Sequence, residues 1–164
     1  LALGVHVWRK TFYHFAVADP GRLYRAGTLP PVGLVLACRF FRIDTVINLR
    51  SHEENALPWH ARQRRQCERL GIELVDLPMP WDTPPTETQL ERFLALTGDP
   101  ERRCLVHCEM GIIRTGMMVL AYRARVQGVE PEDPWALVPG FGHDVRRRRR
   151  PGFQAFVEGF RAGA

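Results

Sequence analysis

The fold is decided by residues 106–116, where an apolar, strand-like run passes through a short turn into a helical segment. This stretch reads Val106-His107-Cys108-Glu109-Met110-Gly111-Ile112-Ile113-Arg114-Thr115-Gly116. Five residues separate Cys108 from Arg114, enough for a loop to curl around one tetrahedral phosphate with its backbone amides turned inward. Gly111 permits the tight bend that such a loop needs. We therefore predict an oxyanion-binding loop between a strand and a helix.

Three side chains of this stretch have the chemistry for a reaction on phosphorus. Loop amides and the positive end of a helix dipole stabilise a thiolate, so Cys108 is the candidate nucleophile. The planar guanidinium of Arg114 can bind two equatorial phosphate oxygens, which a lysine could not match. The hydroxyl of Thr115 could donate a hydrogen bond to the sulfur when the sulfur becomes the leaving group.

On either side of this loop, strand-like apolar runs alternate with helical segments. The expected strands are residues 22–25, 45–49, 73–77 and 104–107. The expected helices start at Pro30-Pro31, span residues 53–70 and 86–97, and run from about 114 to 127, with one or two shorter helices in the tail. This alternation predicts a three-layer α/β sandwich, in which helices flank a central, mostly parallel sheet of four or five strands.

Length and composition indicate a single globular domain. The chain has 164 residues, of which 45% are hydrophobic and 25% charged, and no stretch approaches the roughly 20 apolar residues of a membrane span. We assign residues 20–164 to this domain and residues 1–19 to an N-terminal segment. Because the chain opens at Leu1 with an apolar run, that segment is interpreted as the remnant of an upstream signal or membrane anchor.

Net charge and cysteine content indicate which partners and which cellular compartment to expect. The net charge of +5 favours anionic partners, which include phosphorylated substrates, nucleic acids and membrane surfaces. The four cysteines form no Cys-x-x-Cys pair, and a domain of this size does not need disulfides, so we expect reduced thiols. The cytoplasm is therefore the expected location, with membrane anchoring through a missing upstream segment as the alternative.

The pattern His-Cys-x-x-Gly-x-x-Arg-Thr-Gly at residues 107–116 resembles the signature of the protein tyrosine phosphatase superfamily, particularly its compact dual-specificity branch. Residues 23–27 (Leu-Tyr-Arg-Ala-Gly) and 45–50 (Thr-Val-Ile-Asn-Leu-Arg) are similar to the opening strands of small bacterial dual-specificity-like phosphatases. The similarity extends from about Pro20 to the C-terminal helix. It implies that residues 20–164 form one phosphatase domain.

The resemblance also implies a two-step mechanism. Cys108 would attack phosphorus in line and form a phosphocysteine, while an aspartic acid protonates the leaving oxygen and later activates water. His107 would support the loop and the thiolate rather than act as a base. The phosphate-binding loop would comprise Glu109, Met110, Gly111, Ile112, Ile113 and Arg114. No metal or other cofactor is implied, because the loop amides and Arg114 stabilise the charge of the transition state.

The aspartic acid is expected on the loop after the third strand. Our choice is Asp82, in the Pro-rich segment Pro80-Trp81-Asp82-Thr83-Pro84-Pro85, 26 residues before Cys108. The family places its acid on the corresponding loop, often followed by prolines. Asp76 is the rival, but it falls within a strand-like run and is better explained as a structural residue.

Three further features have competing interpretations. The run Arg146 to Arg150 is interpreted as a solvated segment, with an electrostatic footprint for nucleic acid, acidic lipid or a phosphorylated partner as the alternative. Arg50 could contact the substrate or form an ion pair with Glu53 or Glu54, and the sequence does not decide between them. Cys38, Cys67 and Cys104 are interpreted as packing residues rather than as disulfide partners of Cys108.

The variable loop positions Glu109, Met110, Ile112 and Ile113 provide one acid and three apolar residues. Family members that act on polyphosphoinositides or inositol pyrophosphates usually have basic residues there. We therefore expect a phosphoprotein substrate, phosphotyrosine first, rather than a polyphosphorylated inositol. Nucleic acid is not an expected partner, and we expect a monomer. The alternatives are an inositol-phosphate or phosphoinositide phosphatase, and a catalytically weak module that binds a phosphorylated partner.

Overall fold

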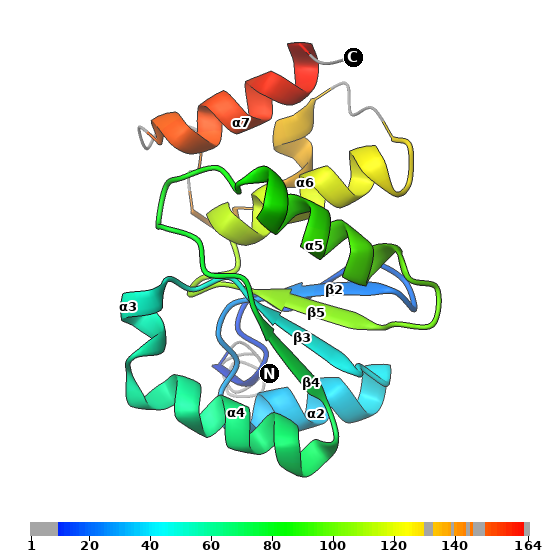
Figure 1. The fold of residues 1–164 in the computed structure, drawn as a ribbon, viewed down its shortest axis with the longest axis vertical. Helices are drawn as coiled ribbons and strands as arrows, with labels where there is room; N and C mark the ends of the chain where they lie inside the picture. Colours follow the sequence, from blue (N-terminus) through cyan, green and yellow to red (C-terminus); the bar gives the residue numbers. More distant parts are fainter. Residues whose placement is uncertain (1–9, 130–132, 139, 144, 146–149, 163–164) are drawn as a thin grey trace.

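The computed structural model describes residues 10–129, 133–138, 140–143, 145 and 150–162. A central sheet lies between two layers of helices, as the sequence predicts (Figure 1). Its five strands are β1 (Ala16–Asp19), β2 (Leu23–Ala26), β3 (Thr45–Asn48), β4 (Glu73–Asp76) and β5 (Cys104–His107). Their order across the sheet is β1-β2-β5-β3-β4. The β2, β3, β4 and β5 strands are parallel, and only β1 pairs antiparallel, with β2.

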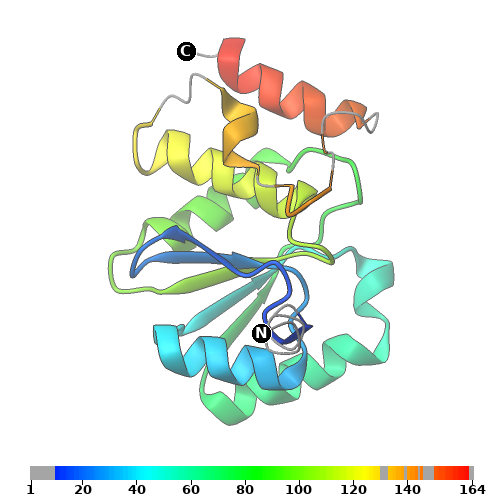
Figure 2. The same ribbon diagram turned by 180° about the vertical axis from the view of Figure 1, so that it is seen from behind.

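The helices are divided between the two faces of the sheet (Figures 1 and 2). One layer contains α2 (Pro31–Phe41), α3 (His52–Asn55) and α4 (Pro58–Leu70). The other contains α5 (Glu87–Gly98), α6 (Ile113–Arg125), the short 3₁₀ helix η1 (Pro134–Leu137) and α7 (Pro151–Ala162). Within the described residues, none of these helices is long and apolar enough to cross a bilayer.

One helix predicted from the sequence is wrong. Residues 53–70 do not form a single helix, because α3 ends at Asn55 and α4 starts at Pro58. Proline disfavours a helical conformation in the residue before it and fits the first turn of a new helix. Leu57, which precedes Pro58, is accordingly extended. The break matters for the site, since α3 begins with its own capping box at Ser51 and Glu54.

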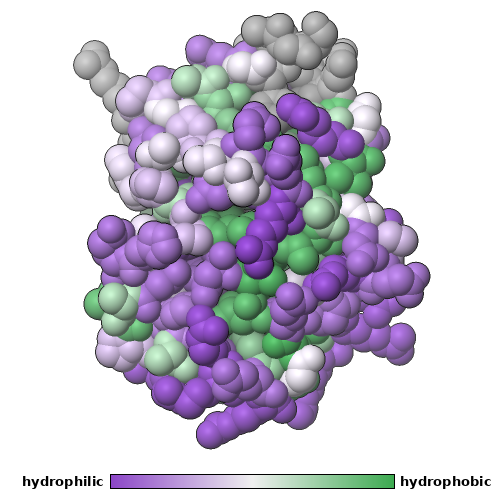
Figure 3. Space-filling view, viewed as in Figure 1, coloured by the Kyte–Doolittle hydropathy of each residue, from purple (hydrophilic) through white to green (hydrophobic). Residues whose placement is uncertain are grey.

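The apolar interior lies on both faces of β5, the central strand. All four residues of β5 are buried, with Cys104 and Val106 facing one apolar cluster and Leu105 the other. Figure 3 shows the outer faces of the helices mostly polar, with apolar residues near the middle of this view, where the sheet meets the two layers. Because β5 is held on both sides and both faces, the loop that follows it starts from a fixed point.

Candidate active site

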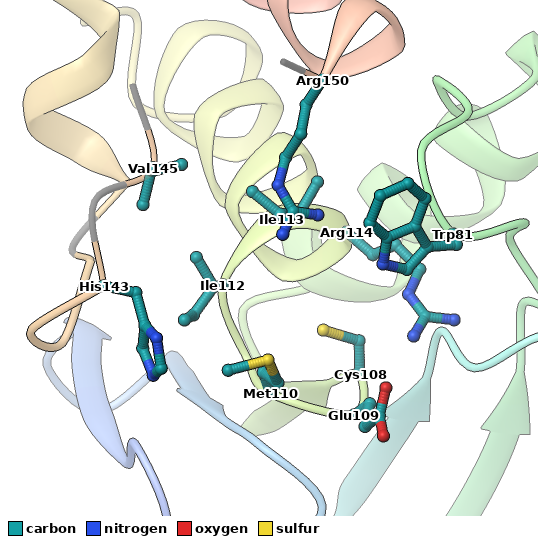
Figure 4. Close-up of a pocket in the computed structure, with 10 residues that line it drawn as sticks. All are labelled: Trp81, Cys108, Glu109, Met110, Ile112, Ile113, Arg114, His143, Val145 and Arg150. Atoms are coloured by element: carbon teal, nitrogen blue, oxygen red, sulfur yellow. The ribbon is translucent and has the colours of Figure 1, made fainter. Parts of the chain in front are cut away.

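The loop that follows β5 lies at the carboxyl end of the parallel strands, where ligand sites form in such sheets. A cavity opens over this loop, and Figure 4 shows the Cys108 sulfur pointing into it. Its lining residues are Trp81, Cys108, Glu109, Met110, Ile112, Ile113, Arg114, His143, Val145 and Arg150. Five of the six residues predicted for the phosphate-binding loop line the cavity. The sixth, Gly111, forms the tightest bend of the loop.

Four successive carbonyl groups of the loop are bound from outside the cavity. The backbone N–H of Thr28 donates to Glu109 O (2.9 Å) and its hydroxyl donates to Cys108 O (3.1 Å). Nδ1 of His14 lies 2.7 Å from Met110 O, and Nη2 of Arg25 donates to Gly111 O at 2.7 Å. Arg25 belongs to β2, Thr28 follows that strand, and His14 precedes β1. Because C=O and the following N–H point in opposite directions across a planar peptide, the loop amides face the cavity.

Gly111 is required by the geometry of this loop. Its φ is +72°, a conformation that residues with a side chain rarely adopt. A Cβ there would lie 2.4 Å from the carbonyl carbon and oxygen of Ala26, so the loop could not stay against β2. The N–H of Gly111 donates to the Cys108 sulfur at 3.2 Å. This bond stabilises negative charge on the sulfur.

Arg114, in the first turn of α6, is buried and held by an acid from the other helix layer. Both of its Nη atoms donate to the carboxylate of Glu54, and Nη1 also donates to Met79 O at 3.3 Å. Burial alone would lower the pKa of Arg114, but the Glu54 hydrogen bonds and the Cys108 charge raise it. Burial likewise disfavours ionised Glu54, yet the bonds from Arg114 and from the Ser51 backbone lower its pKa to about 2. The ion pair therefore fixes the guanidinium beside the cavity.

Arg50 belongs to the same network and makes structural contacts. Its Nε donates to Glu54 at 3.0 Å and its Nη1 to the Thr28 hydroxyl at 3.0 Å. Its guanidinium lies over the Trp59 ring, 4.2 Å from the ring centroid. Arg50 does not line the cavity, so of the two interpretations left open by the sequence, the ion pair with Glu54 is the one observed.

His107 is buried behind the loop. Its Nε2 lies 3.1 Å from Nε2 of Gln63, and its Nδ1 lies 3.4 Å from Cys108 O. Burial lowers the pKa of His107 to about 4, so the imidazole is neutral near pH 7. In this arrangement the Gln63 amide donates to Nε2, and Nδ1–H faces the loop carbonyl. A neutral, buried imidazole fits the supporting role expected of it.

Thr115 is buried immediately after Arg114. Its hydroxyl has no hydrogen-bond partner among the residues that the structure describes. The expected donation to the departing sulfur therefore stays a prediction.

Asp82, the expected acid, does not line the cavity. Its carboxylate accepts hydrogen bonds from Gly152 N (3.4 Å) and Phe153 N (3.3 Å), at the start of α7. Its neighbour Trp81 lines the cavity instead, with 59% of its surface exposed. As a general acid, Asp82 would have to leave the end of α7 and turn toward Cys108.

Asp76, the rival acid, is held by other side chains at the end of β4. Its carboxylate is bonded to Asn48 Nδ2 (2.8 Å), His60 Nε2 (2.9 Å) and Arg64 Nη2 (2.9 Å). It does not line the cavity either. These contacts fit the structural role that the sequence suggested for Asp76.

The interpretation of the arginine run was wrong for Arg150. Residues 146–149 lie outside the described residues, but Arg150 is buried and lines the cavity. Its guanidinium lies over the Trp81 ring, 4.6 Å from the ring centroid. Because Pro151 starts α7 directly above the loop that contains Trp81, this arginine is turned inward, as Figure 4 shows. The cavity thus has a second guanidinium that the sequence analysis did not assign to it.

The remaining cysteines are free and buried, as expected. Burial raises the pKa of Cys38 and Cys104 to about 12 and that of Cys67 to about 11. Thiols with such values are almost fully protonated near pH 7 and are poor nucleophiles. Cys108 is the cysteine that opens into the cavity.

Sequence reasoning missed His14, Arg25 and Thr28, which hold the loop from outside, and it named Glu54 as a partner for Arg50 but not for Arg114. Arg25 had a detectable signal, because a lone arginine inside a buried parallel strand must have a partner. It is 3% exposed, and burial lowers its pKa to about 10 although the Cys108 charge opposes this. The other three give no such signal, since polar residues in turns and short helices are common.

The chain was compared with known families and structures. A family model described as "PTP-NADK: DSP-PTPase phosphatase fused to NAD+ Kinase" matches residues 22–149. Comparison with curated protein sequences gave no match.

Several solved structures have a similar fold. A DUF442 protein from Shewanella putrefaciens CN-32 is 20% identical, with a TM-score of 0.74 over 94% of this chain and 92% of the other. The core catalytic domain of the PP-IP phosphatase Siw14 from S. cerevisiae is 18% identical, with a TM-score of 0.72 over 90% and 85%. Human DUSP28 is 17% identical, with a TM-score of 0.62 over 92% and 94%.

Proposed function

The chain belongs to the dual-specificity-like protein tyrosine phosphatases and is a phosphatase, and from that premise we propose that it hydrolyses phosphomonoesters through a phosphocysteine on Cys108. One observation carries the proposal. The Cys108 sulfur and the Arg114 guanidinium border one cavity, and the amides of the connecting loop face the same space. A phosphoryl group placed there meets a nucleophile, a bidentate cation and a ring of N–H donors.

In the first step the Cys108 thiolate attacks phosphorus, so that an S–P bond forms while the bond from phosphorus to the leaving oxygen breaks. The leaving oxygen takes a proton from Asp82. In the second step a water oxygen attacks phosphorus, its proton returns to the Asp82 carboxylate, and the S–P bond breaks to release phosphate and the thiolate. Arg114 and the loop amides bind the three equatorial oxygens throughout.

The test is hydrolysis of p-nitrophenyl phosphate by the purified protein in EDTA and reductant. Cys108→Ser should lower turnover at least about a thousandfold, because the nucleophile is lost. The variant should still bind vanadate, since the loop and Arg114 remain. Cys104→Ala is the matched control, as this thiol lies at the start of β5, the strand that leads into the loop, and does not line the cavity. Substantial turnover by Cys108→Ser would sink the mechanism, and vanadate binding without turnover by the wild type would indicate a binding module.

For the substrate, we propose an aryl phosphomonoester such as phosphotyrosine. Met110, Ile112 and Val145 provide an apolar wall to the cavity, and Trp81 presents a largely exposed ring beside it. An aromatic leaving group would pack against these side chains.

A second candidate, a multiply phosphorylated small molecule, is favoured by Arg150. A guanidinium beside the cavity could bind a further phosphate of the same substrate, and the similar fold of a PP-IP phosphatase supports this alternative. The two candidates differ in their response to Arg150→Gln. This substitution should lower kcat/KM for an inositol polyphosphate about tenfold or more, because a charge-assisted hydrogen bond is lost, and should change that for phosphotyrosine by less than about threefold. An equal fall in kcat/KM for both substrates would contradict the second candidate.

A further inference from the structure

The helix layer opposite the catalytic cavity has an apolar stripe on its outer side. Val32, Leu36 and Phe40 follow one another at intervals of four along α2, so they lie on one face of that helix. Their exposed fractions are 66%, 46% and 81%. The opposite face of α2 is buried, with Leu34, Ala37 and Cys38 in the apolar interior. An α2 that is apolar on its outward face as well has more apolar surface than its place in the fold requires.

Arginines follow the neighbouring helix in the same way. Arg62, Arg65 and Arg69 of α4 are spaced to share one face and are exposed. Within the described part of the chain, none of the three has an ion-pair or hydrogen-bond partner. Arg64, which points elsewhere, pairs with Asp76. These three arginines outnumber Glu68, the one acid of α4, so the outer side of this helix is positively charged.

A groove lies between the start of α2 and these arginines. It has a volume of about 260 Å³ and is lined by Pro31, Arg62, Arg65, Gln66 and Arg69. The Gln66 side chain donates to Pro31 O at 2.6 Å, which ties α4 to the start of α2. No acidic residue lines the groove. Its size and donors fit a phosphate-bearing head group.

Because α2 and α4 lie side by side in one layer (Figures 1 and 2), the apolar stripe and the arginines face outward from the same side of the molecule. We propose that this surface, the α2–α4 face, binds the surface of an anionic lipid bilayer. Leu36 and Phe40 enter the boundary between head groups and acyl chains, while the arginines bind lipid phosphates. Charge complementarity favours this occupant over a second copy of the chain, since two such arginine clusters would repel each other.

Binding by this face would leave the catalytic cavity accessible. The cavity is built by the loop after β5, the Trp81 loop and the side chains of His143, Val145 and Arg150, whereas the α2–α4 face belongs to the other helix layer (Figure 1). The bilayer would therefore position the enzyme without covering Cys108. Turnover of a small soluble substrate should be the same with and without vesicles.

The test is co-sedimentation of the full chain with vesicles of equimolar phosphatidylglycerol and phosphatidylcholine, compared with phosphatidylcholine alone. The protein should sediment with the anionic vesicles, and added salt should weaken binding. Arg65→Gln with Arg69→Gln should lower the partition coefficient about twenty-five-fold, at about fivefold per charge. Phe40→Ser should lower it about tenfold or more, because a phenyl ring is kept out of the acyl boundary.

Two controls separate this proposal from a general effect of charge or apolar surface. Arg92→Gln with Arg125→Gln removes the same charge from exposed positions of the other layer, and Val129→Ser removes an apolar side chain that is 42% exposed after α6. Both should bind as the wild type does, and thermal unfolding shows whether each variant is folded. Equal binding to both kinds of vesicle, or equal losses in the controls, would overturn the proposal. A solution dimer that Phe40→Ser dissociates, without vesicle binding, would assign the face to a second copy instead.

Discussion

Replacing Asp82 by asparagine separates the two roles that the structure allows for this residue. Its carboxylate lies at the start of α7, where it accepts hydrogen bonds from Gly152 N and Phe153 N at 3.4 and 3.3 Å. A cap for α7 needs the side chain to stay there. A general acid needs it to leave and reach the oxygen that departs from phosphorus. The substitution removes the proton of the acid but keeps an oxygen that can cap.

The two roles differ in magnitude. A side-chain cap contributes roughly 0.5–2 kcal/mol, and bonds of 3.3–3.4 Å, beyond the usual range for N–H···O bonds, place Asp82 at the low end. A cap of about 1 kcal/mol changes the balance between the two positions of Asp82 by only about fivefold. Proton transfer by a general acid contributes about a hundredfold to ten-thousandfold in rate. The cap is therefore weak enough for Asp82 to leave, and the loss of the acid is large enough to measure.

The assay compares phenyl phosphate with p-nitrophenyl phosphate at one pH. Phenol is the more basic leaving group and needs the proton, whereas p-nitrophenol departs with little protonation. Asp82→Asn should lower kcat for phenyl phosphate at least about a hundredfold and for p-nitrophenyl phosphate less than about tenfold. The free energy of unfolding in urea should fall by less than about 1 kcal/mol.

Asp76→Asn is the matched control. Because this carboxylate holds Asn48, His60 and Arg64, the substitution should lower the free energy of unfolding by about 1–3 kcal/mol without distinguishing the two substrates. Asp82 is not the general acid if Asp82→Asn lowers kcat equally for both substrates, or if it only lowers the free energy of unfolding. A leaving-group effect in Asp76→Asn would move the acid to that residue.

Two further predictions concern the anchors of the site. Glu54→Gln removes a carboxylate whose pKa falls from 4.5 unfolded to about 2 folded, so its contribution to stability is present above pH 4.5 and is lost as the pH falls toward 2. Because Glu54 is partly exposed, we expect the free energy of unfolding in urea at pH 7 to fall by roughly 1–2 kcal/mol, and this difference should disappear toward pH 2. A difference in the free energy of unfolding that does not depend on pH would contradict the ion pair. Arg25→Met leaves the buried Gly111 carbonyl without the donor at 2.7 Å, so stability should fall by about 1–3 kcal/mol and vanadate affinity about tenfold. Arg22→Met, which removes a bond to Gly98 O, should lower stability alone, and unchanged vanadate affinity in Arg25→Met would exclude Arg25 as an anchor.

Much of the fold follows from local sequence. The runs at 45–49 and 104–107 became β3 and β5, which are buried along their whole length, because a central parallel strand is covered on both faces. The run at 73–77 became the edge strand β4, whose apolar residues alternate less regularly with Glu73 and Asp76. The strand β1 was missed. It has only four residues and one side chain that is fully buried, so its sequence resembles an ordinary loop before the Pro20-Gly21 turn.

The catalytic loop could be predicted, whereas its surroundings could not. The Cys-to-Arg spacing, the glycine and the flanking strand are local, and a single segment contains them all. The bonds of His14 and Thr28 to the loop span 80 to 96 residues, and the bond that Arg114 donates to Glu54 spans 60. Such partners depend on which strands become neighbours, which no local pattern specifies. Arg150 was misassigned for the same reason, since its contact with Trp81 depends on where α7 packs.

These distant anchors explain how the loop can be ready for phosphate before phosphate arrives. A loop whose amides converge on an empty centre is unfavourable in isolation, because like dipoles face one another without a partner. Here the opposite ends of those peptides are satisfied by Thr28, His14 and Arg25, three partners positioned by the β1–β2 part of the chain. Glu54 similarly holds Arg114 while also closing the capping box of α3. The cost of orienting the donors is therefore met during folding, so substrate binding does not have to reorganise them and their full electrostatic effect is available to the transition state.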